Sequence, residues 1–161
     1  MKNKKVLIVI FLFIVGIFSI SISTDNFFFT TKYYKTPIEA YNSDGTYHAI
    51  YGDTSAKKEV GLILLDNETC LFIGEIDNNN FVVSELDVKK DKYSSRGMRY
   101  YYDINEVSYT TDENVTKISN GIIKWGIYYN KSQAESVPNA FSIKSFALSN
   151  ENEFYLVLVE E

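Results

Sequence analysis

The sequence predicts an α+β fold that is mainly antiparallel β, in which an N-terminal transmembrane or signal helix and one short helix precede a meandering sheet or small sandwich. Three observations lead to this prediction. One uninterrupted apolar stretch, Val6–Ile22, stands at the N terminus. After residue 45, short runs of β-branched and aromatic residues alternate with turns rich in Asn, Asp and Gly. Strands do not alternate with helical segments, so a parallel sheet is not expected.

The apolar stretch is bounded by charged residues. Lys2, Lys4 and Lys5 precede it, and the next charged residue is Asp25. As a helix, Val6–Ile22 spans about 25 Å, and its length falls at the short end of the range of about 17–25 residues for a bilayer crossing. The lysines place the N terminus in the cytoplasm and the following domain outside.

A cleaved signal peptide is the alternative, with Ser19–Ser21 or Ser21–Ser23 as a small-x-small cleavage site. The apolar stretch is longer than the roughly 7–15 residues of a signal, and the aromatic residues at 27–29, 33 and 34 suit an interfacial belt. We therefore favour an uncleaved anchor, which makes the protein a single-pass membrane protein with its domain outside; cleavage would make it a secreted one. The predicted organisation is an anchor or signal at 1–24, a juxtamembrane linker at 25–35 and an extracytoplasmic β-rich domain at 36–161.

The first folded element is a short helix that begins after Thr36. Thr36 can cap the helix, Pro37 suits its first position, and Glu39 completes a capping box. The run Asn42–Gly45 then ends the helix, because glycine readily takes the left-handed position that follows a helix.

Strand-forming runs fill most of the remaining sequence. Leu71–Ile73 shows no polar alternation, as expected for a strand covered on both faces, and Phe154–Val159 is apolar on both faces and is expected at the centre of a sheet. Asn120-Gly121 predicts a two-residue hairpin turn. The segment at 89–96 is predicted to be an exposed hairpin end, and the segment at 130–140 is predicted to be a loop with one helical turn. The expected strands are 46–51, 59–65, 70–76, 81–88, 99–105, 115–118, 122–129, 141–148 and 154–159.

Composition restricts the possible partners. The net charge of the 161 residues is −5, and because three lysines lie in the leader, the outer domain carries −8. An acidic domain repels phosphate backbones, so nucleic acid is not an expected partner. The single cysteine, Cys70, rules out an intramolecular disulfide and is expected to be a small buried apolar residue.

No catalytic, cofactor or metal motif stands out. His48 is the only histidine and falls in a predicted strand, so a hydrogen-bonded structural role is favoured over a catalytic one. One histidine and one cysteine do not suffice for a zinc site. Asp77–Asn80 supplies oxygen atoms but departs from the EF-hand pattern, and is expected to form a turn.

Tyrosine is the unusual feature of the composition, with 13 residues. In the strand at 99–105, a period of two places Arg99, Tyr101 and Asp103 on one face and Tyr100 and Tyr102 on the other. One face can join the core while the other offers an aromatic platform to a partner. Arg99, Tyr101 and Asp103 are therefore the candidate binding residues.

The Lys-rich start, the apolar leader, the aromatic linker and the run Thr36-Pro37-Ile38-Glu39-Ala40 resemble small uncharacterised exported or membrane-anchored proteins of Gram-positive bacteria. In those proteins a Thr-Pro-x-Glu-Ala helix precedes a meandering sheet. The resemblance implies the same order of elements here and no particular activity, so no functional residue follows from it.

The function predicted from the sequence is a non-enzymatic, membrane-tethered extracytoplasmic domain that binds a protein or a cell-surface component. Two alternatives remain open. One is an immunity-type protein that neutralises a toxin at the membrane. The other is a hydrolase that uses a pair of carboxylates, in which case two acidic side chains should lie about 5–10 Å apart in a cleft.

Overall fold

The computed structural model describes residues 31–43, 54–105 and 113–159, and residues Tyr33–Glu161 form one compact unit. The predicted anchor Val6–Ile22, the predicted strand at 46–51 with His48, and Gly45 lie outside the described residues. Within the described residues, no helix has both the length and the apolar character needed to cross a membrane.

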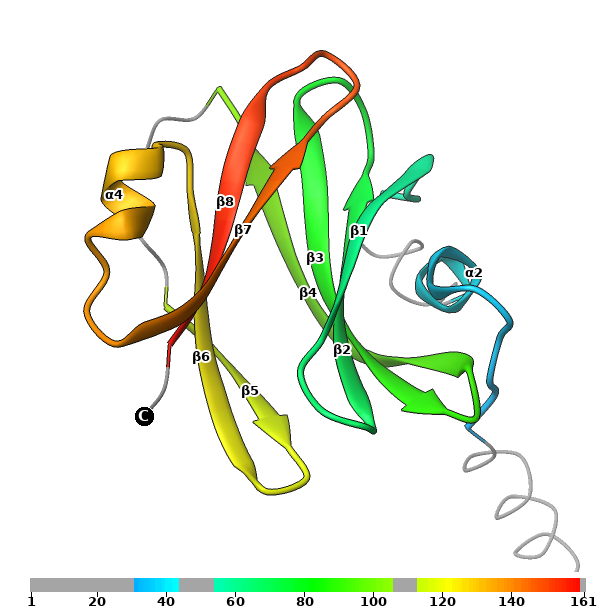
Figure 1. Cartoon of the computed structure of the whole chain (residues 1–161). Coiled ribbons are helices and arrows are strands. Elements are labelled where there is room, and N and C mark those ends of the chain that lie inside the picture. The colour runs from blue at the N-terminus through cyan, green and yellow to red at the C-terminus, as the bar shows by residue number, and fades with distance from the viewer. Residues whose placement is uncertain (1–30, 44–53, 106–112, 160–161) are drawn as a thin grey trace, which may run out of the picture. The chain divides into compact units, whose positions relative to one another are not determined.

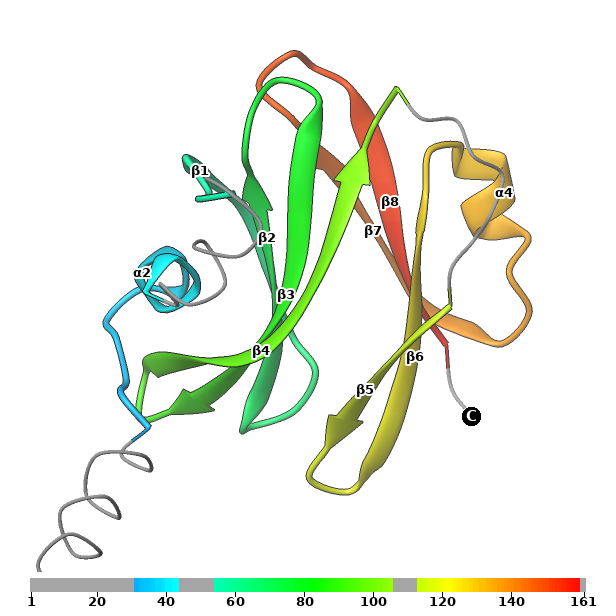
Figure 2. The same ribbon diagram turned by 180° about the vertical axis from the view of Figure 1, so that it is seen from behind.

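The fold consists of two four-stranded antiparallel sheets that pack face to face (Figures 1 and 2). The prediction of a mainly antiparallel β fold is therefore confirmed. Sheet A follows the chain order β1-β2-β3-β4, and its strands are β1 (Lys58–Leu64), β2 (Thr69–Glu75), β3 (Asn80–Lys89) and β4 (Lys92–Asp103). Sheet B has the order β5-β6-β8-β7, and its strands are β5 (Asn114–Ile118), β6 (Gly121–Tyr128), β7 (Ala140–Ala147) and β8 (Glu153–Val159).

The main core lies between the two sheets. Phe81 of β3 stacks on Phe154 of β8 with ring centroids 4.1 Å apart, and Tyr100 of β4 meets Trp125 of β6 edge-on at 4.9 Å. The central position predicted for 154–159 is confirmed, because β8 pairs with both β6 and β7. The buried members of this cluster are Ile63, Leu71, Ile73, Phe81, Val83, Trp125, Ile127, Leu148, Phe154, Leu156 and Leu158.

A second cluster covers the opposite face of sheet A. There the helix α2 (Pro37–Asn42) packs on the sheet (Figure 1). It does so through Ala40 and Tyr41, both fully buried, and the Tyr41 ring lies 5.5 Å from that of Phe72. The predicted capping box at Thr36 and Glu39 is present. The helix ends at Asn42, with Ser43 as its C-cap.

Strand β2 is buried along its whole length because both of its faces are covered. Leu71 and Ile73 face sheet B, whereas Cys70 and Phe72 face α2. The prediction of a doubly covered strand at Leu71–Ile73 is therefore confirmed. Cys70 is buried as expected, and burial raises the pKa of its thiol to about 12, which keeps it protonated and unreactive.

Two turns differ from the sequence prediction. The segment at 89–96 is mostly strand, and the turn is confined to Lys90-Asp91, where both residues have positive φ (50° and 56°) as a tight hairpin turn requires. In the β5–β6 hairpin Ile118 pairs with Gly121, so the turn residues are Ser119-Asn120 rather than Asn120-Gly121. Gly121 instead starts β6 with φ of 152°.

The loop at 130–140 contains the short helix α4 (Lys131–Glu135), as predicted. Asn130 caps it by accepting a hydrogen bond from the Ser132 amide, at 2.9 Å. The buried Ala134 is its contact with the rest of the domain.

Polar contacts join the two sheets at the turns. The amide and hydroxyl of Ser119, in the β5–β6 turn of sheet B, donate to Asp66 in the β1–β2 turn, at 2.7 and 2.8 Å. Burial opposes ionisation of Asp66, but these hydrogen bonds and one from the Glu68 amide outweigh it and lower the pKa to about 2. At another turn, the amide and hydroxyl of Ser149 donate to the buried carboxylate of Glu75.

A buried carboxylate lies inside the inter-sheet core. The indole of Trp125 donates to the Thr116 hydroxyl at 2.8 Å, and that hydroxyl donates to Glu85 at 2.9 Å. Glu85 is 5% exposed, and burial raises its pKa even though Thr116 and the charge of Arg96 act in the opposite direction. The folded protein therefore holds this proton more tightly than the unfolded chain does, and stability is lost as the pH rises through the folded-state pKa.

Glu85→Gln removes this dependence, because the amide keeps an acceptor oxygen for Thr116 and carries no charge. We expect the free energy of unfolding of the variant, relative to the unmodified protein, to rise between pH 4 and pH 8 in urea denaturation. Glu68→Gln, in the exposed β1–β2 turn, is the matched control. If the free energies of unfolding of Glu85→Gln and the unmodified protein differ by the same amount at pH 4 and pH 8, burial of Glu85 does not set the pH dependence.

Candidate functional site

The candidate binding residues lie near the end of β4, the last strand of sheet A. The predicted alternation is confirmed, because Tyr100 and Tyr102 pack against the inter-sheet core while Tyr101 pairs with Val82 on the face that carries α2. The two faces therefore have different neighbours, and each candidate residue has to be placed separately.

Arg99 is buried beneath α2 and does not lie at the surface. It is only 8% exposed; its guanidinium donates to the Tyr41 carbonyl at 2.8 Å and lies 4.3 Å from the centroid of the Tyr41 ring. A cation over an aromatic face and a charge-assisted hydrogen bond both fix the helix on the sheet. In this position Arg99 contacts Tyr41 of α2 and is not itself available to a ligand.

Tyr101 is 38% exposed, and its hydroxyl is held by neighbouring groups. That hydroxyl donates to the Thr54 hydroxyl at 3.2 Å and lies 3.4 Å from the Tyr41 hydroxyl. Tyr41 in turn donates to the Thr54 carbonyl at 2.8 Å. Burial first, and the Tyr101 hydroxyl second, raise the pKa of Tyr41, so it remains a neutral donor.

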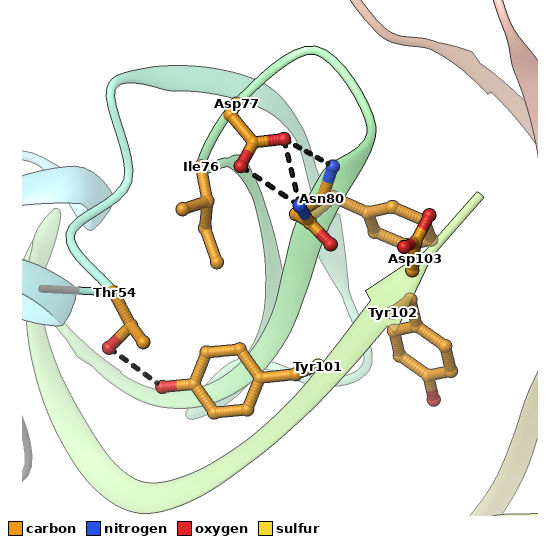
Figure 3. Close-up of a pocket in the computed structure, with 8 residues that line it drawn as sticks. Thr54, Ile76, Asp77, Asn80, Tyr101, Tyr102 and Asp103 are labelled. Atoms are coloured by element: carbon orange, nitrogen blue, oxygen red, sulfur yellow. Dashed lines mark hydrogen bonds between the residues drawn. The ribbon is translucent and has the colours of Figure 1, made fainter. Parts of the chain in front are cut away.

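Tyr101 and Asp103 line one open pocket of about 430 Å³, which we call the Tyr101 pocket (Figure 3). Side chains from three places in the chain form its wall: the segment before β1, the β2–β3 turn together with the start of β3, and the end of β4. In Figure 3 Ile76, Asp77 and Asn80 lie above the Tyr101 ring, and Asp77 and Asn80 are joined by hydrogen bonds. The lining residues are Thr54, Ile76, Asp77, Asn80, Phe81, Tyr101, Tyr102 and Asp103.

Asp77 is held rigidly by its own turn. Its Oδ1 accepts hydrogen bonds from the amides of Asn79 and Asn80, both at 2.9 Å, and the Asn80 side-chain amide donates to both carboxylate oxygens. The Asn79 amide first, and then the Asn80 side chain, lower the pKa of Asp77. It is therefore ionised at neutral pH and has the turn-forming role predicted for Asp77–Asn80.

Asp103 is the second carboxylate of the pocket. Its Oδ1 accepts hydrogen bonds from the amide and the side chain of Asn105, at 2.8 and 3.2 Å. Within the described residues, no group of three or more His, Cys, Asp or Glu side chains is arranged to hold a metal ion. The carboxylates of Asp77 and Asp103 thus present acceptor oxygens whose positions are fixed by hydrogen bonds from neighbouring residues.

A second pocket of about 680 Å³ lies on the same β2–β3 turn and shares Ile76, Asp77 and Asn80 with the first. It is lined in addition by Lys57 and Lys58, and by Glu75, whose carboxylate lies 3.9 Å from the Lys58 ammonium. The two pockets therefore differ in charge, because basic side chains line only this second one.

Sequence reasoning identified Tyr101 and Asp103 but not the residues that complete the pocket. Asn80 and Asp77 were recognisable only as turn residues, and Thr54 was not among the candidates. Their proximity to Tyr101 depends on the pairing of β3 with β4, which brings Asn80 opposite Asp103.

No protein-family model, curated protein or solved structure matches the chain.

Substitutions at Tyr101 separate its hydroxyl from its ring. We expect Tyr101→Phe to lower the free energy of unfolding by about 1 kcal/mol, the net value of a typical hydrogen bond. Tyr101→Ala also removes the ring contacts and should cost about 2 kcal/mol, less than for a fully buried aromatic residue. Urea denaturation measures both, with Phe141→Ala, which removes a 49% exposed ring from β7, as the control. Equal losses for the two Tyr101 variants would show that the ring adds nothing to stability.

Proposed function

We propose that this protein is a non-enzymatic binding domain, tethered to the cell membrane by Val6–Ile22 with its β-rich domain outside, and that the Tyr101 pocket is its contact site. The proposal rests on one observation: a single open pocket is lined by Tyr101, Asp103, Asp77 and Asn80. Its partner is a protein or a component of the cell surface.

The pocket is preorganised, which supports a binding role. The Tyr101 hydroxyl is engaged by Thr54 and Tyr41, and the carboxylates of Asp77 and Asp103 accept hydrogen bonds from their own turns. Side chains that are already ordered lose little conformational entropy when a ligand binds. The exposed aromatic ring is the residue type most often responsible for binding energy at an interface.

A carboxylate-dependent hydrolase is the second candidate, because Asp77 and Asp103 line the same pocket. Such an enzyme needs one carboxyl group with a raised pKa to act as general acid. The hydrogen bonds to Asp77 lower its pKa, so Asp77 is unsuited to that role. The general acid of such an enzyme would have to be Asp103, and the binding function, which requires no general acid, ranks first.

The topology can be tested in intact cells. We expect the full-length chain to sediment with the membrane fraction and its outer domain to be cut by protease added outside the cells. N-terminal sequencing distinguishes an uncleaved anchor from a cleaved signal. Full-length protein in the cytosolic fraction, protected from added protease, would refute the tethered extracytoplasmic proposal.

The contact site can be tested by retention of the purified full-length protein on isolated cell envelopes. We expect Tyr101→Ala to weaken retention about tenfold, since loss of an aromatic anchor commonly costs more than 1 kcal/mol of binding energy. Phe141→Ala removes a comparably exposed ring from sheet B and should bind like the unmodified protein. If Tyr101→Ala is retained as well as Phe141→Ala, the pocket is not the contact site.

A further inference from the structure

We propose that the ligand of the Tyr101 pocket is a neutral carbohydrate, bound with a pyranose ring against Tyr101 and its hydroxyl groups directed to the rim. This inference rests on the proposed binding function and names the chemical class of the ligand. Four features of the pocket support it: the exposure and orientation of the Tyr101 ring, the hydrogen-bond acceptors, the charge of the lining residues and the volume.

The Tyr101 ring is accessible and has a restricted orientation. The hydrogen bond from its hydroxyl to Thr54 and the neighbouring Tyr41 hydroxyl limit rotation, while 38% of the residue stays exposed to solvent. Ile76 also lines the pocket and lies above the ring in Figure 3. A sugar ring has one face made of C–H groups, and that face packs well against a fixed aromatic ring.

Three side chains that line the pocket, those of Asp77, Asn80 and Asp103, can accept hydrogen bonds from sugar hydroxyl groups. The side-chain nitrogen of Asn80 donates to both oxygens of Asp77, which leaves the amide oxygen as the group that Asn80 presents to a ligand. Asp77 and Asp103 add carboxylate oxygens, which accept bonds only. Neighbouring hydroxyl groups on one ring can donate to several fixed acceptors at once, and hydrogen bonds to a charged acceptor are the stronger ones.

The charge of the pocket selects against anionic polymers. Its wall contains Asp77 and Asp103 but no Lys or Arg, although the charge of Lys57, in the adjoining pocket, acts on Asp77. The domain as a whole is acidic. Each carboxylate already accepts hydrogen bonds from its own turn, so its charge is partly compensated before any ligand arrives. The carboxylates thus serve as hydrogen-bond acceptors for neutral hydroxyls rather than as counter-ions for a cation.

The size of the pocket is consistent with a small sugar unit. A volume of about 430 Å³ lies within the range of roughly 300–1,000 Å³ that is typical of small-molecule sites. The pocket is open, so one or two units of a longer chain can enter while the remainder stays in solvent.

Calorimetry of the full-length protein with four probes tests the proposal. The probes are the tetramer of N-acetylglucosamine and maltotetraose, which are neutral, the tetramer of glucosamine, which is cationic, and a hyaluronan tetramer, which is anionic. We expect at least one neutral probe to bind, with an affinity that changes less than twofold between 50 and 500 mM salt, because no ion pair is formed. Hyaluronan should not bind.

Three variants give the site-specific readout. Tyr101→Ala should weaken binding of the neutral probe at least tenfold, and Tyr101→Phe should recover most of that loss because it restores the ring. Phe141→Ala, outside the pocket, should leave the affinity unchanged. Circular dichroism of each variant confirms that loss of binding does not reflect loss of folding.

The outcomes separate this inference from the proposed function. If neither neutral probe binds, or if binding is confined to the cationic probe and disappears at high salt, the carbohydrate assignment is overturned. Envelope retention that depends on Tyr101 but is not reduced by an excess of either neutral tetramer overturns it as well, and leaves the binding function standing. Failure of the binding function itself is recognised by retention that Tyr101→Ala does not change.

Discussion

The structure depends on covering both faces of strands β2 and β3. Both strands carry apolar side chains on each face, as in the unbroken run of buried residues from Cys70 to Ile73. Exposure of either face would cost roughly 25 cal/mol for each Å² of apolar surface. Sheet B covers one face and α2 covers the other, so the chain before β1 and the chain after β4 are both required to complete one sheet.

The cover provided by α2 also builds the candidate site. Tyr41 fills the space over Phe72, and its hydroxyl then reaches Thr54 and Tyr101 at the margin of the sheet. Arg99 lies against the Tyr41 ring and holds the end of the helix. The same contacts that bury the outer face of sheet A therefore orient the aromatic ring at the base of the Tyr101 pocket. Binding and stability are coupled through these residues, which is why Tyr101→Phe is needed beside Tyr101→Ala.

Charged groups are placed according to their surroundings. Asp66 and Asp77 sit in turns, where backbone amides stabilise their ionised forms. Glu85 is enclosed between the sheets, where its hydrogen-bond partners are the neutral hydroxyls of Thr116 and Tyr100. Asp77, at the pocket, belongs to the first kind, and this leaves it ionised, ordered and available as an acceptor to a ligand.

By itself the sequence determined the local elements of this domain: the capping box at Thr36, the doubly buried run at Leu71–Ile73, and the period of two around Tyr101. Each follows from interactions between residues a few positions apart, or from the simple rule that apolar side chains are covered. The tertiary structure alone decided that Arg99 is buried and Tyr101 exposed, although both share one face, because only the position of α2 distinguishes them. The tertiary structure also determined which residues line the pocket, because the pairing of β3 with β4 brings Asn80 opposite Asp103. No local pattern in the sequence indicates which distant residues become neighbours in this way.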